Sequence, residues 1–373
     1  MAETLKARYG PEVPRRIAAM VERVHPAFDS HRFVAQALDG YDGLELMGRA
    51  RRIALALDAH LPADFGAALR VVLRSAREPV PAAPDDALAS FVYLPHTLWL
   101  AARGLGHLDA SAAAMRELTQ RFSCEFAVRP FLDRHPQAML AVLARWVDDP
   151  SPQVRRLVSE GTRPRLPWAP RLQAFGRDPA PVLALLERLR DDPDEAVRRS
   201  VANHLNDLGR ADPDRLVALC ARWAQGAPPA RLRLVRHALR TLVKRGDPRA
   251  LAVLGYPGRA RVRLQDVTIA PARPRIGARV TISFVLASTA RAPQRILVDL
   301  RVSYAGRGGA ERPKVFKLAT AELAAGGRLA LRKGLSLRQM STRTHHPGRH
   351  RVEALVNGQA VEVGAFDLLP ARP

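Results

Sequence analysis

The sequence predicts a mainly α-helical repeat solenoid followed by a small all-β sandwich. Three observations support this fold class: apolar residues recur at helical spacing through the first two-thirds of the chain, one segment is repeated after 43 residues, and short alternating apolar runs begin near Gly258. At 373 residues the chain is long enough for two or three domains. We therefore expect a helical domain over residues 1–257 and a β domain over residues 258–373.

The N-terminal region is expected to form successive helices. Apolar residues at helical spacing mark the first one: Ile17, Met20, Val21 and Val24. Asp29 and Ser30 suit the N-cap of the next helix, and a further helix is expected over residues 61–78. The proline-rich stretch 79–84 predicts a loop, after which helices resume near Asp86.

A repeat occupies the second half of the helical region. The segment 148–158 recurs as 191–201, which brings Val154 and Val197 to the same position. A period of this length with Val-Arg-Arg at the head of the second helix indicates HEAT-like repeats, whose concave face binds partners. We expect a weaker copy at Val235 and an earlier one that begins at Thr119.

The C-terminal part reads as a separate β domain. Alternating apolar runs over residues 262–264, 280–284 and 296–300 are separated by Pro and Gly turns, which is typical of a sandwich. Residues 258–373 contain 21 Lys and Arg against 7 Asp and Glu, a net charge of +14, whereas the rest of the chain carries +9. The sequence therefore predicts a β domain that meets a polyanion.

The whole chain is strongly basic. It holds 59 Lys and Arg against 36 Asp and Glu, a formal charge of +23, and only five of the basic residues are Lys. Arginine suits phosphate because its planar guanidinium donates two hydrogen bonds at once. These numbers favour a nucleic acid as partner; the alternative is a solvated basic surface that reflects a GC-rich genome.

Composition excludes several classes of protein. With 47% hydrophobic and 25% charged residues, the chain is globular and not disordered. Cys124 and Cys220 form neither a disulfide framework nor a metal-ligand spacing. No apolar run approaches the length of a membrane span, and the first residues contain no hydrophobic signal core, so we expect a cytoplasmic protein without a membrane partner.

Acidic residues are expected on the arginine-rich concave face. The repeat alignment gives Glu160 and Asn203 the same position, places Glu125 there in the earlier copy, and puts Asp207 one helical turn beyond Asn203. Carboxylates in an anion-binding groove either pair with arginines to hold its shape or stabilise a developing cation. Candidate partners for such pairing are Arg121, Arg129, Arg156 and Arg199.

Two loops contain further candidates. Trp168 ends a loop of prolines and arginines over residues 160–168; it either plugs the helix ends or offers its π face to a sugar or base. The segment 341–350 reads as an exposed basic loop, whose Pro347-Gly348 turn presents Arg343 and Arg349 to phosphates. Its histidines have no carboxylate or cysteine at a metal-ligand spacing, so phosphate contact is favoured over a metal.

Three blocks of sequence resemble the AlkC branch of the HEAT-like-repeat DNA glycosylases. They are Arg121–Leu132, Val154–Trp168 and Arg198–Asp207, and they occur in the same order. The resemblance covers most of the helical region and is looser before residue 90. The segment 258–373 resembles the immunoglobulin-like module that one subgroup of this branch appends.

The resemblance implies a monofunctional DNA glycosylase that removes N3-alkylated bases, 3-methyladenine and in second place 3-methylcytosine. It implies an abasic product and a lesion that stays largely stacked in the duplex. We expect no cofactor or metal, because no site for either is visible in the sequence. A lyase step is not expected, because none of the three blocks contains a Lys. The implied partner is double-stranded DNA with alkylated bases, and we expect a monomer.

The resemblance also implies the site. Asp207 and Glu125 are expected nearest the sugar and the attacking water, with Glu160 in support and Trp168 over the sugar. The expected DNA contacts are Arg129, Arg156, Arg163, Arg165, Arg199, Asn203, His204, Arg343, His345, His346 and Arg349. The alternative from another class is a catalytically silent HEAT scaffold that binds nucleic acid or an acidic protein; such a scaffold does not need the acids and Trp168 together.

Overall fold

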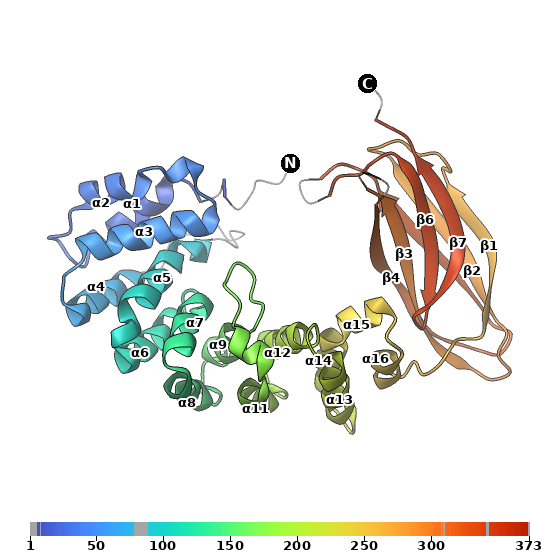
Figure 1. Cartoon of the computed structure of the whole chain (residues 1–373), viewed down its shortest axis with the longest axis horizontal. Helices are drawn as coiled ribbons and strands as arrows, with labels where there is room; N and C mark the ends of the chain where they lie inside the picture. Colours follow the sequence, from blue (N-terminus) through green and yellow to red (C-terminus); the bar gives the residue numbers. More distant parts are fainter. Residues whose placement is uncertain are drawn as a thin grey trace. The chain divides into compact units, whose positions relative to one another are not determined.

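The computed structural model describes residues 6–7, 9–77, 89–306, 308, 310–340 and 343–371. The first helices are α1 (Glu12–Glu22), α2 (Ser30–Leu38), α3 (Leu46–His60), α4 (Phe65–Arg77), α5 (Leu94–Arg103), α6 (Leu108–Leu118), α7 (Glu125–Arg134) and α8 (Pro136–Trp146). The later helices are α9 (Pro152–Gly161), α10 (Gln173–Arg177), α11 (Ala180–Leu189), α12 (Glu195–Leu208), α13 (Pro213–Ala224), α14 (Pro229–Ala238), α15 (Arg240–Arg245) and α16 (Pro248–Val253). The strands are β1 (Val262–Ala270), β2 (Arg279–Ser288), β3 (Gln294–Ala305), β4 (Glu311–Leu323), β5 (Arg328–Ser336), β6 (Gly348–Val356) and β7 (Gln359–Leu368) (Figure 1).

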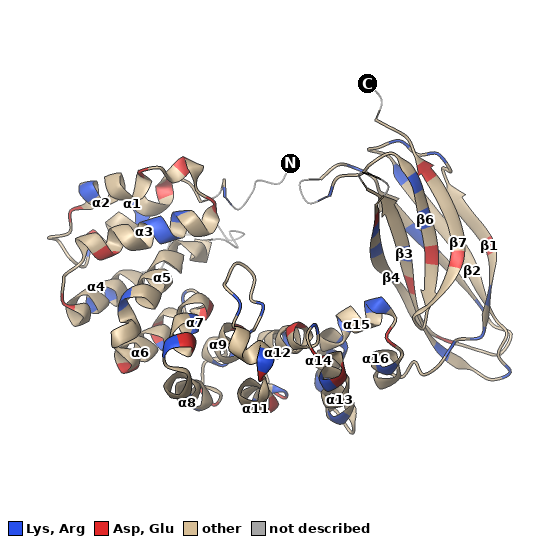
Figure 2. Ribbon diagram, viewed as in Figure 1, with Lys and Arg blue, Asp and Glu red and all other residues tan. Residues whose placement is uncertain are grey.

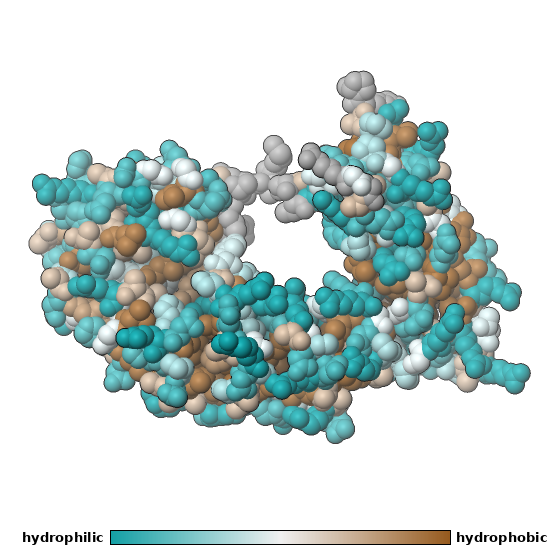
Figure 3. Space-filling view, in the orientation of Figure 1, coloured by the Kyte–Doolittle hydropathy of each residue, from teal (hydrophilic) through white to brown (hydrophobic). Residues whose placement is uncertain are grey.

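These elements confirm the predicted order of a helical part followed by a β part. The loop expected over residues 79–84 and the helix expected near Asp86 lie outside the described residues. None of the described helices is long and apolar enough to cross a membrane. In the space-filling view, hydrophilic side chains cover most of the visible surface of both the helices and the strands (Figure 3).

The chain forms two compact units. The first unit runs to Ala211 and includes Pro228–Leu234, whereas the second unit contains Asp212–Ala227 and everything from Val235 onward. The last helices therefore belong to the same unit as the β sandwich.

Within the first unit the helices form two rows. Helices α3, α5, α7, α9 and α12 pack in succession, each against the next. Helices α4, α6, α8 and α11 follow one another along the other side (Figure 1). Because α7, α9 and α12 are neighbours in one row, residues from the three predicted sequence blocks come together.

The repeated Asp-Asp-Pro segment builds the same turn twice. Asp149 Oδ1 accepts a bond of 2.9 Å from the Ser151 N–H, and Asp192 Oδ1 accepts one of 2.8 Å from the Asp194 N–H. The carboxylate of Asp192 also pairs with Arg155 at 2.6 Å, which links α9 to the turn before α12. The first arginine of each Arg-Arg pair is thus a structural residue of the repeat.

The two weaker repeat copies, expected at Thr119 and at Val235, do not align with the helices as predicted. Thr119 lies at the end of α6, and the chain turns before α7 begins at Glu125. Glu125 is therefore the first residue of its helix, whereas Glu160 lies in the last turn of α9. Val235 lies late in α14, while Val154 lies in the first turn of α9, so this weaker copy is also out of phase.

The β part is a sandwich of two antiparallel sheets with strand orders β1-β2-β5 and β4-β3-β6-β7. Alternate residues of each strand enter the core, as the period of two predicts; on β3 these are Ile296, Val298, Leu300 and Val302, all fully buried. The immunoglobulin-like sandwich expected from the sequence is confirmed.

Helices α15 and α16 pack against this sandwich within the second unit. Leu251 and Tyr256 bury against Leu297 of β3. Gly246 and Gly358 approach so closely that a Cβ on Gly246 would lie 2.7 Å from the Gly358 carbonyl oxygen. Both residues have positive φ angles, 78° and 79°, so the left-handed backbone and the close approach both require glycine.

Candidate functional site

Three carboxylates meet at the ends of neighbouring helices. Glu125 begins α7, Glu160 lies in the last turn of α9, and Asp207 lies in the last turn of α12. Two of the three, Glu160 and Asp207, are almost fully buried. Packing of α9 against both α7 and α12 therefore produces the cluster that the sequence predicted.

Arg163 joins two of these carboxylates. Its Nη1 donates to Glu160 Oε1 at 2.6 Å, and its Nε donates to Asp207 Oδ2 at 2.8 Å. Only 8% of Arg163 is exposed, because both ends of its guanidinium are engaged inside the protein. Its side chain builds the carboxylate cluster, and the expected contact of Arg163 with DNA stays a prediction.

Arg156 lies on the more open side of the cluster. Its Nη2 is 3.4 Å from Glu125 Oε2 and 3.7 Å from Glu160 Oε2. Two guanidiniums, those of Arg156 and Arg163, therefore pair with the three carboxylates. Arg129 also lies close enough to interact electrostatically with Glu125 and Asp207. Charge pairing shapes the site, as one of the two sequence interpretations expected.

Burial raises the pKa of the Glu125 and Asp207 carboxyls above their ordinary values. For Glu125 the neighbouring Arg156 opposes this effect of burial, and for Asp207 the hydrogen bond from Arg163 opposes it. Both groups are thus poorly hydrated carboxylates that gain from a nearby positive charge. This is the property that a site for a developing cation requires.

The loop after α9 is held by Arg129. This residue is 4% exposed and donates to the carbonyl oxygens of Gly161 at 3.2 Å, of Arg163 at 2.7 Å and of Pro170. Both terminal nitrogens of the guanidinium make these bonds, whereas the buried Nε has no hydrogen-bond partner among the described residues. Arg129 therefore has a structural role in the loop, and its expected DNA contact stays a prediction.

Trp168 occupies a strained position in this loop. It has a φ of 64°, is 52% exposed, and touches the Phe91 ring edge-on with the centroids 6.4 Å apart. About half of its surface is therefore open to solvent. A non-glycine residue in left-handed backbone often marks a functional position.

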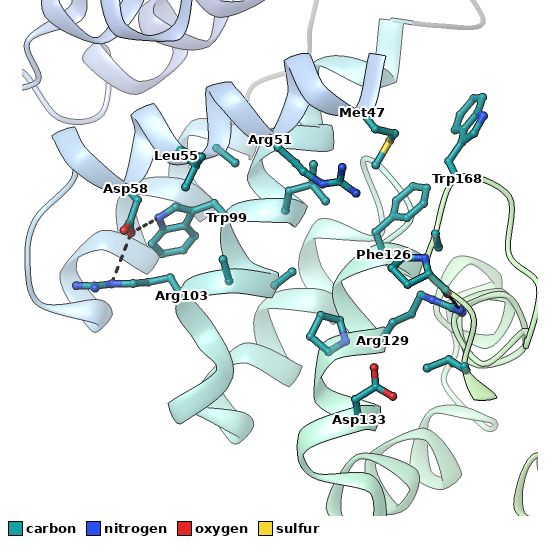
Figure 4. A pocket seen from close by; sticks show the side chains of 18 residues that line it. Met47, Arg51, Leu55, Asp58, Trp99, Arg103, Phe126, Arg129, Asp133 and Trp168 are labelled. Carbon is teal, nitrogen blue, oxygen red and sulfur yellow. Dashed lines mark hydrogen bonds and ion pairs between the residues drawn. The ribbon is translucent and has the colours of Figure 1, made fainter. Parts of the chain in front are cut away.

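Trp168 borders a pocket of about 390 Å³ between α3, α5, α7 and the loop. Figure 4 shows Trp168 and Phe126 at one end of this pocket, and Asp58 with its partners Trp99 and Arg103 at the other. Aromatic and aliphatic side chains make up most of its wall.

The remaining expected contacts in the helical part separate into exposed and buried residues. Arg165 and Arg199 are exposed, Arg199 in an ion pair with Glu195, and Asn203 is half-buried. His204 is fully buried, and burial lowers its pKa to about 3, so its neutral ring donates from Nδ1 to the Ser159 carbonyl at 3.1 Å. The ring of His204 is therefore enclosed by the protein, and its expected contact with DNA stays a prediction.

The basic loop of the β domain is less exposed than expected. His345 is 3% exposed and packs against the Tyr304 ring, so it does not face solvent. Arg343 and His346 are half-buried, and Arg349 is exposed. Residues 341–342 of this loop lie outside the described part of the chain. Lys and Arg are found on several strands of the sandwich (Figure 2).

Sequence reasoning missed two residues of the site. Arg210 is exposed and close enough to Asp207 to lower the pKa of that carboxyl. Ser200 is buried and bonds to Glu160 at 2.6 Å. The sequence does contain a sign of Ser200. It is a polar residue between Val197 and Val201, at a position of α12 where the helical spacing predicts a core residue.

Comparison with known proteins identifies the family. A family model described as "DNA alkylation repair enzyme" matches residues 121–240, and one described as "Uncharacterised protein YhaZ, C-terminal Ig-like domain" matches residues 263–370. The Bacillus subtilis protein YhaZ is 33% identical over 356 residues, which is 95% of this chain and 96% of YhaZ. The Pseudomonas fluorescens alkylpurine DNA glycosylase AlkC, solved with DNA containing an abasic site analog, is 36% identical, with a TM-score of 0.92 over 98% of this chain and 100% of AlkC.

The chain belongs to the AlkC-type branch of the HEAT-like-repeat DNA glycosylase family. The match to AlkC spans both the helices and the immunoglobulin-like sandwich, so the family assignment includes the C-terminal domain. In this AlkC-type protein the carboxylate cluster lies within the segment that the alkylation-repair model covers.

Proposed function

We propose that this protein is a monofunctional DNA glycosylase that removes cationic N3-alkylated bases, first 3-methyladenine and second 3-methylcytosine, from double-stranded DNA. The observation that carries the proposal is the meeting of three largely buried carboxylates, Glu125, Glu160 and Asp207, at the ends of neighbouring helices inside a strongly basic chain. Its membership of the AlkC branch, and the DNA bound by AlkC itself, support the choice of substrate class.

The chemistry follows from the charge of the lesion. An N3-alkylated purine already carries a positive charge, so its glycosidic bond is weak and the departing base needs little help from an acid. The protein then has to stabilise the oxocarbenium-like sugar and to orient water, which a nearby carboxylate does. The lesion stays largely stacked, because this chemistry needs access to the sugar and not to the base.

The three carboxylates differ in their freedom to act. Both oxygens of Glu160 are engaged, Oε1 by Arg163 and Oε2 by Ser200, so Glu160 supports its neighbours. Among the described residues, Asp207 accepts a hydrogen bond through Oδ2 alone, and Glu125 makes a longer contact of 3.4 Å. Asp207 and Glu125 therefore face the sugar and the water, and the exposed ring of Trp168 covers the sugar.

DNA is held by the exposed cations of both domains. In the helical domain, residues 1–257, these are the exposed Arg165 and Arg199, together with the half-buried Arg156. The β domain, residues 258–373, carries a net charge of +14 and acts as a clamp through Arg349 and the half-buried Arg343 and His346. The product is an abasic site, because no lysine lies in the blocks that form the site.

Release of free base from methylated duplex DNA tests the proposal. Purified protein in a chelator, without nucleotide, should release 3-methyladenine and leave an abasic strand that breaks only after alkali. The Glu125→Ala and Asp207→Ala variants should bind the DNA and release no base. DNA binding without any release by the wild type would favour the silent scaffold, and activity that returns only with added metal would contradict the metal-free chemistry.

A further inference from the structure

Ser200 makes two short contacts beside the carboxylate cluster. It lies on α12, is 2% exposed, and places its hydroxyl 2.6 Å from Glu160 Oε2 and 3.0 Å from Ser159 Oγ. A buried hydroxyl cannot bond to water, so the carboxylate and the second hydroxyl are the partners that satisfy it, and loss of either bond is costly.

The direction of these hydrogen bonds follows from counting hydrogens. Ser200 has one hydroxyl hydrogen, and an ionised carboxylate only accepts. Ser200 therefore donates to Glu160, and Ser159 donates to Ser200. A hydroxyl that accepts one hydrogen bond donates a stronger one, and a distance of 2.6 Å is that of a charge-assisted bond.

This chain of hydroxyls fixes Glu160 from one side while Arg163 holds it from the other. Oε1 receives Arg163 Nη1 at 2.6 Å, and Oε2 is 3.7 Å from Arg156. Without the hydroxyl of Ser200, Oε2 loses its donor, and rotation of the carboxylate towards Arg156 would give it a closer positive charge. The same rotation would draw Oε1 away from Arg163 Nη1, and the guanidinium of Arg163 could then pair with both oxygens of Asp207.

We propose that Ser200, with Ser159 behind it, is a positioning residue that holds Glu160 on Arg163 and so keeps one oxygen of Asp207 free for a cation at the sugar. The identity of that cation rests on the proposed function. Ser200 does not touch the substrate in this scheme; it sets how one guanidinium is divided between two carboxylates.

The test compares two duplex DNAs that differ only in the charge of an abasic analogue. One contains a pyrrolidine ring, which is cationic at neutral pH, and the other contains the neutral tetrahydrofuran ring. The measured quantity is the ratio of the two dissociation constants for the wild type, Ser200→Ala, Ser200→Thr and Ser159→Ala. Ser111→Ala is the matched control, because Ser111 is a buried serine of α6 whose hydroxyl bonds to the Gly104 carbonyl.

We expect the wild type to prefer the cationic ring and Ser200→Ala to lose about tenfold of this preference, the order of one hydrogen bond to a charged group. Ser159→Ala should lose less of this preference, because it removes only the hydrogen bond that strengthens the Ser200 hydroxyl as a donor. Ser200→Thr, which keeps the hydroxyl, should retain the preference, and Ser111→Ala should leave the ratio unchanged even if it melts at a lower temperature.

The inference is overturned if the wild type shows no preference, if Ser200→Ala keeps the wild-type ratio, or if both DNAs lose affinity equally. Base release is assayed in parallel to separate the two proposals. A wild type that shows the expected ratios without releasing base contradicts the proposed glycosylase and leaves the positioning role standing. Base release combined with an unchanged ratio in Ser200→Ala contradicts the positioning role alone.

Discussion

Asp207 is the residue on which the proposed chemistry depends most, because Arg163 occupies only its Oδ2 atom. We expect Asp207→Asn to lower the single-turnover rate of base release by about 10²–10³-fold, the range found when one electrostatic group is removed from a preorganised site. The amide keeps the shape of the side chain, so affinity for DNA with a neutral abasic analogue should change little. Asp109→Asn, at an exposed position of α6, is the control. A rate close to the wild-type value would exclude Asp207 from the reaction.

The raised pKa values of Glu125 and Asp207 predict the pH dependence of activity and of stability. Base release needs both groups ionised, so the rate should fall as the pH is lowered through their raised pKa values, above the ordinary carboxyl range. In the same window the folded protein binds more protons than the unfolded chain. The contribution of these groups to stability is therefore present in acid and is lost as the pH rises.

Single-turnover rates and melting temperatures, measured across this pH range, check both statements. Glu125→Gln is the comparison for the stability curve, because the variant lacks one of the two titrating groups and should show a flatter curve. An acid limb of the rate profile at or below the ordinary carboxyl range would contradict the desolvated site.

At the scale of the helix, the repeated Asp-Pro turn should govern stability through Asp192. This buried carboxylate caps the turn before α12 and pairs with Arg155. We expect Asp192→Ala to lower the free energy of unfolding by about 3 kcal/mol, because it leaves a largely buried guanidinium unpaired and removes a cap. Urea unfolding followed by far-UV circular dichroism measures the change.

The neighbouring Asp191 provides a matched control. It also pairs with an arginine, Arg231, but its side chain is 42% exposed. Asp191→Ala should therefore cost about 1 kcal/mol or less. Equal losses of unfolding free energy in Asp192→Ala and Asp191→Ala would show that burial does not strengthen the contacts of Asp192.

At the scale of the whole molecule, the β domain continues into helices of the same compact unit. Leu251 and Tyr256 bury against Leu297, so a chain cut at Gly258 would expose this apolar contact. Weaker DNA binding by such a truncated protein would mix lost phosphate contacts with lost packing. Single substitutions therefore test the clamp more sharply than a deletion.

Arg349 is the residue with which to test the clamp. It is exposed on β6, and its neighbour Arg351 is paired with Glu311 at 2.6 Å. Arg349→Ala should lower the slope of log affinity against log salt by about 0.9, the value for one phosphate contact. Arg351→Ala changes the net charge equally and should leave the slope nearly unchanged. Equal slopes for the wild type and Arg349→Ala would remove Arg349 from the interface.

Local patterns in the sequence were enough to predict a helical part followed by a β part, and to select the acids of the site. Helical spacing, the 43-residue repeat and the alternating runs after Gly258 are local patterns, and local patterns decide which elements form. The three blocks were sufficient to select Glu125, Glu160, Trp168 and Asp207 as a group. The repeat phase at Thr119 was wrong, because a turn before α7 shifts the start of that helix, and no periodicity of apolar residues records such a shift.

Which charged residues are available to a ligand depends on how the helices pack, and no local pattern in the sequence reveals it. Several polar residues beside the acids look alike in the sequence. Packing buries Arg129, Arg163 and His204, whereas it leaves Arg165 exposed. Burial removes water from a polar group, which must then find its hydrogen bonds among neighbours that are distant in sequence, as Arg163 does with Asp207 and Ser200 with Glu160. Those partners are set by how α7, α9 and α12 pack, and that arrangement is a property of the folded chain.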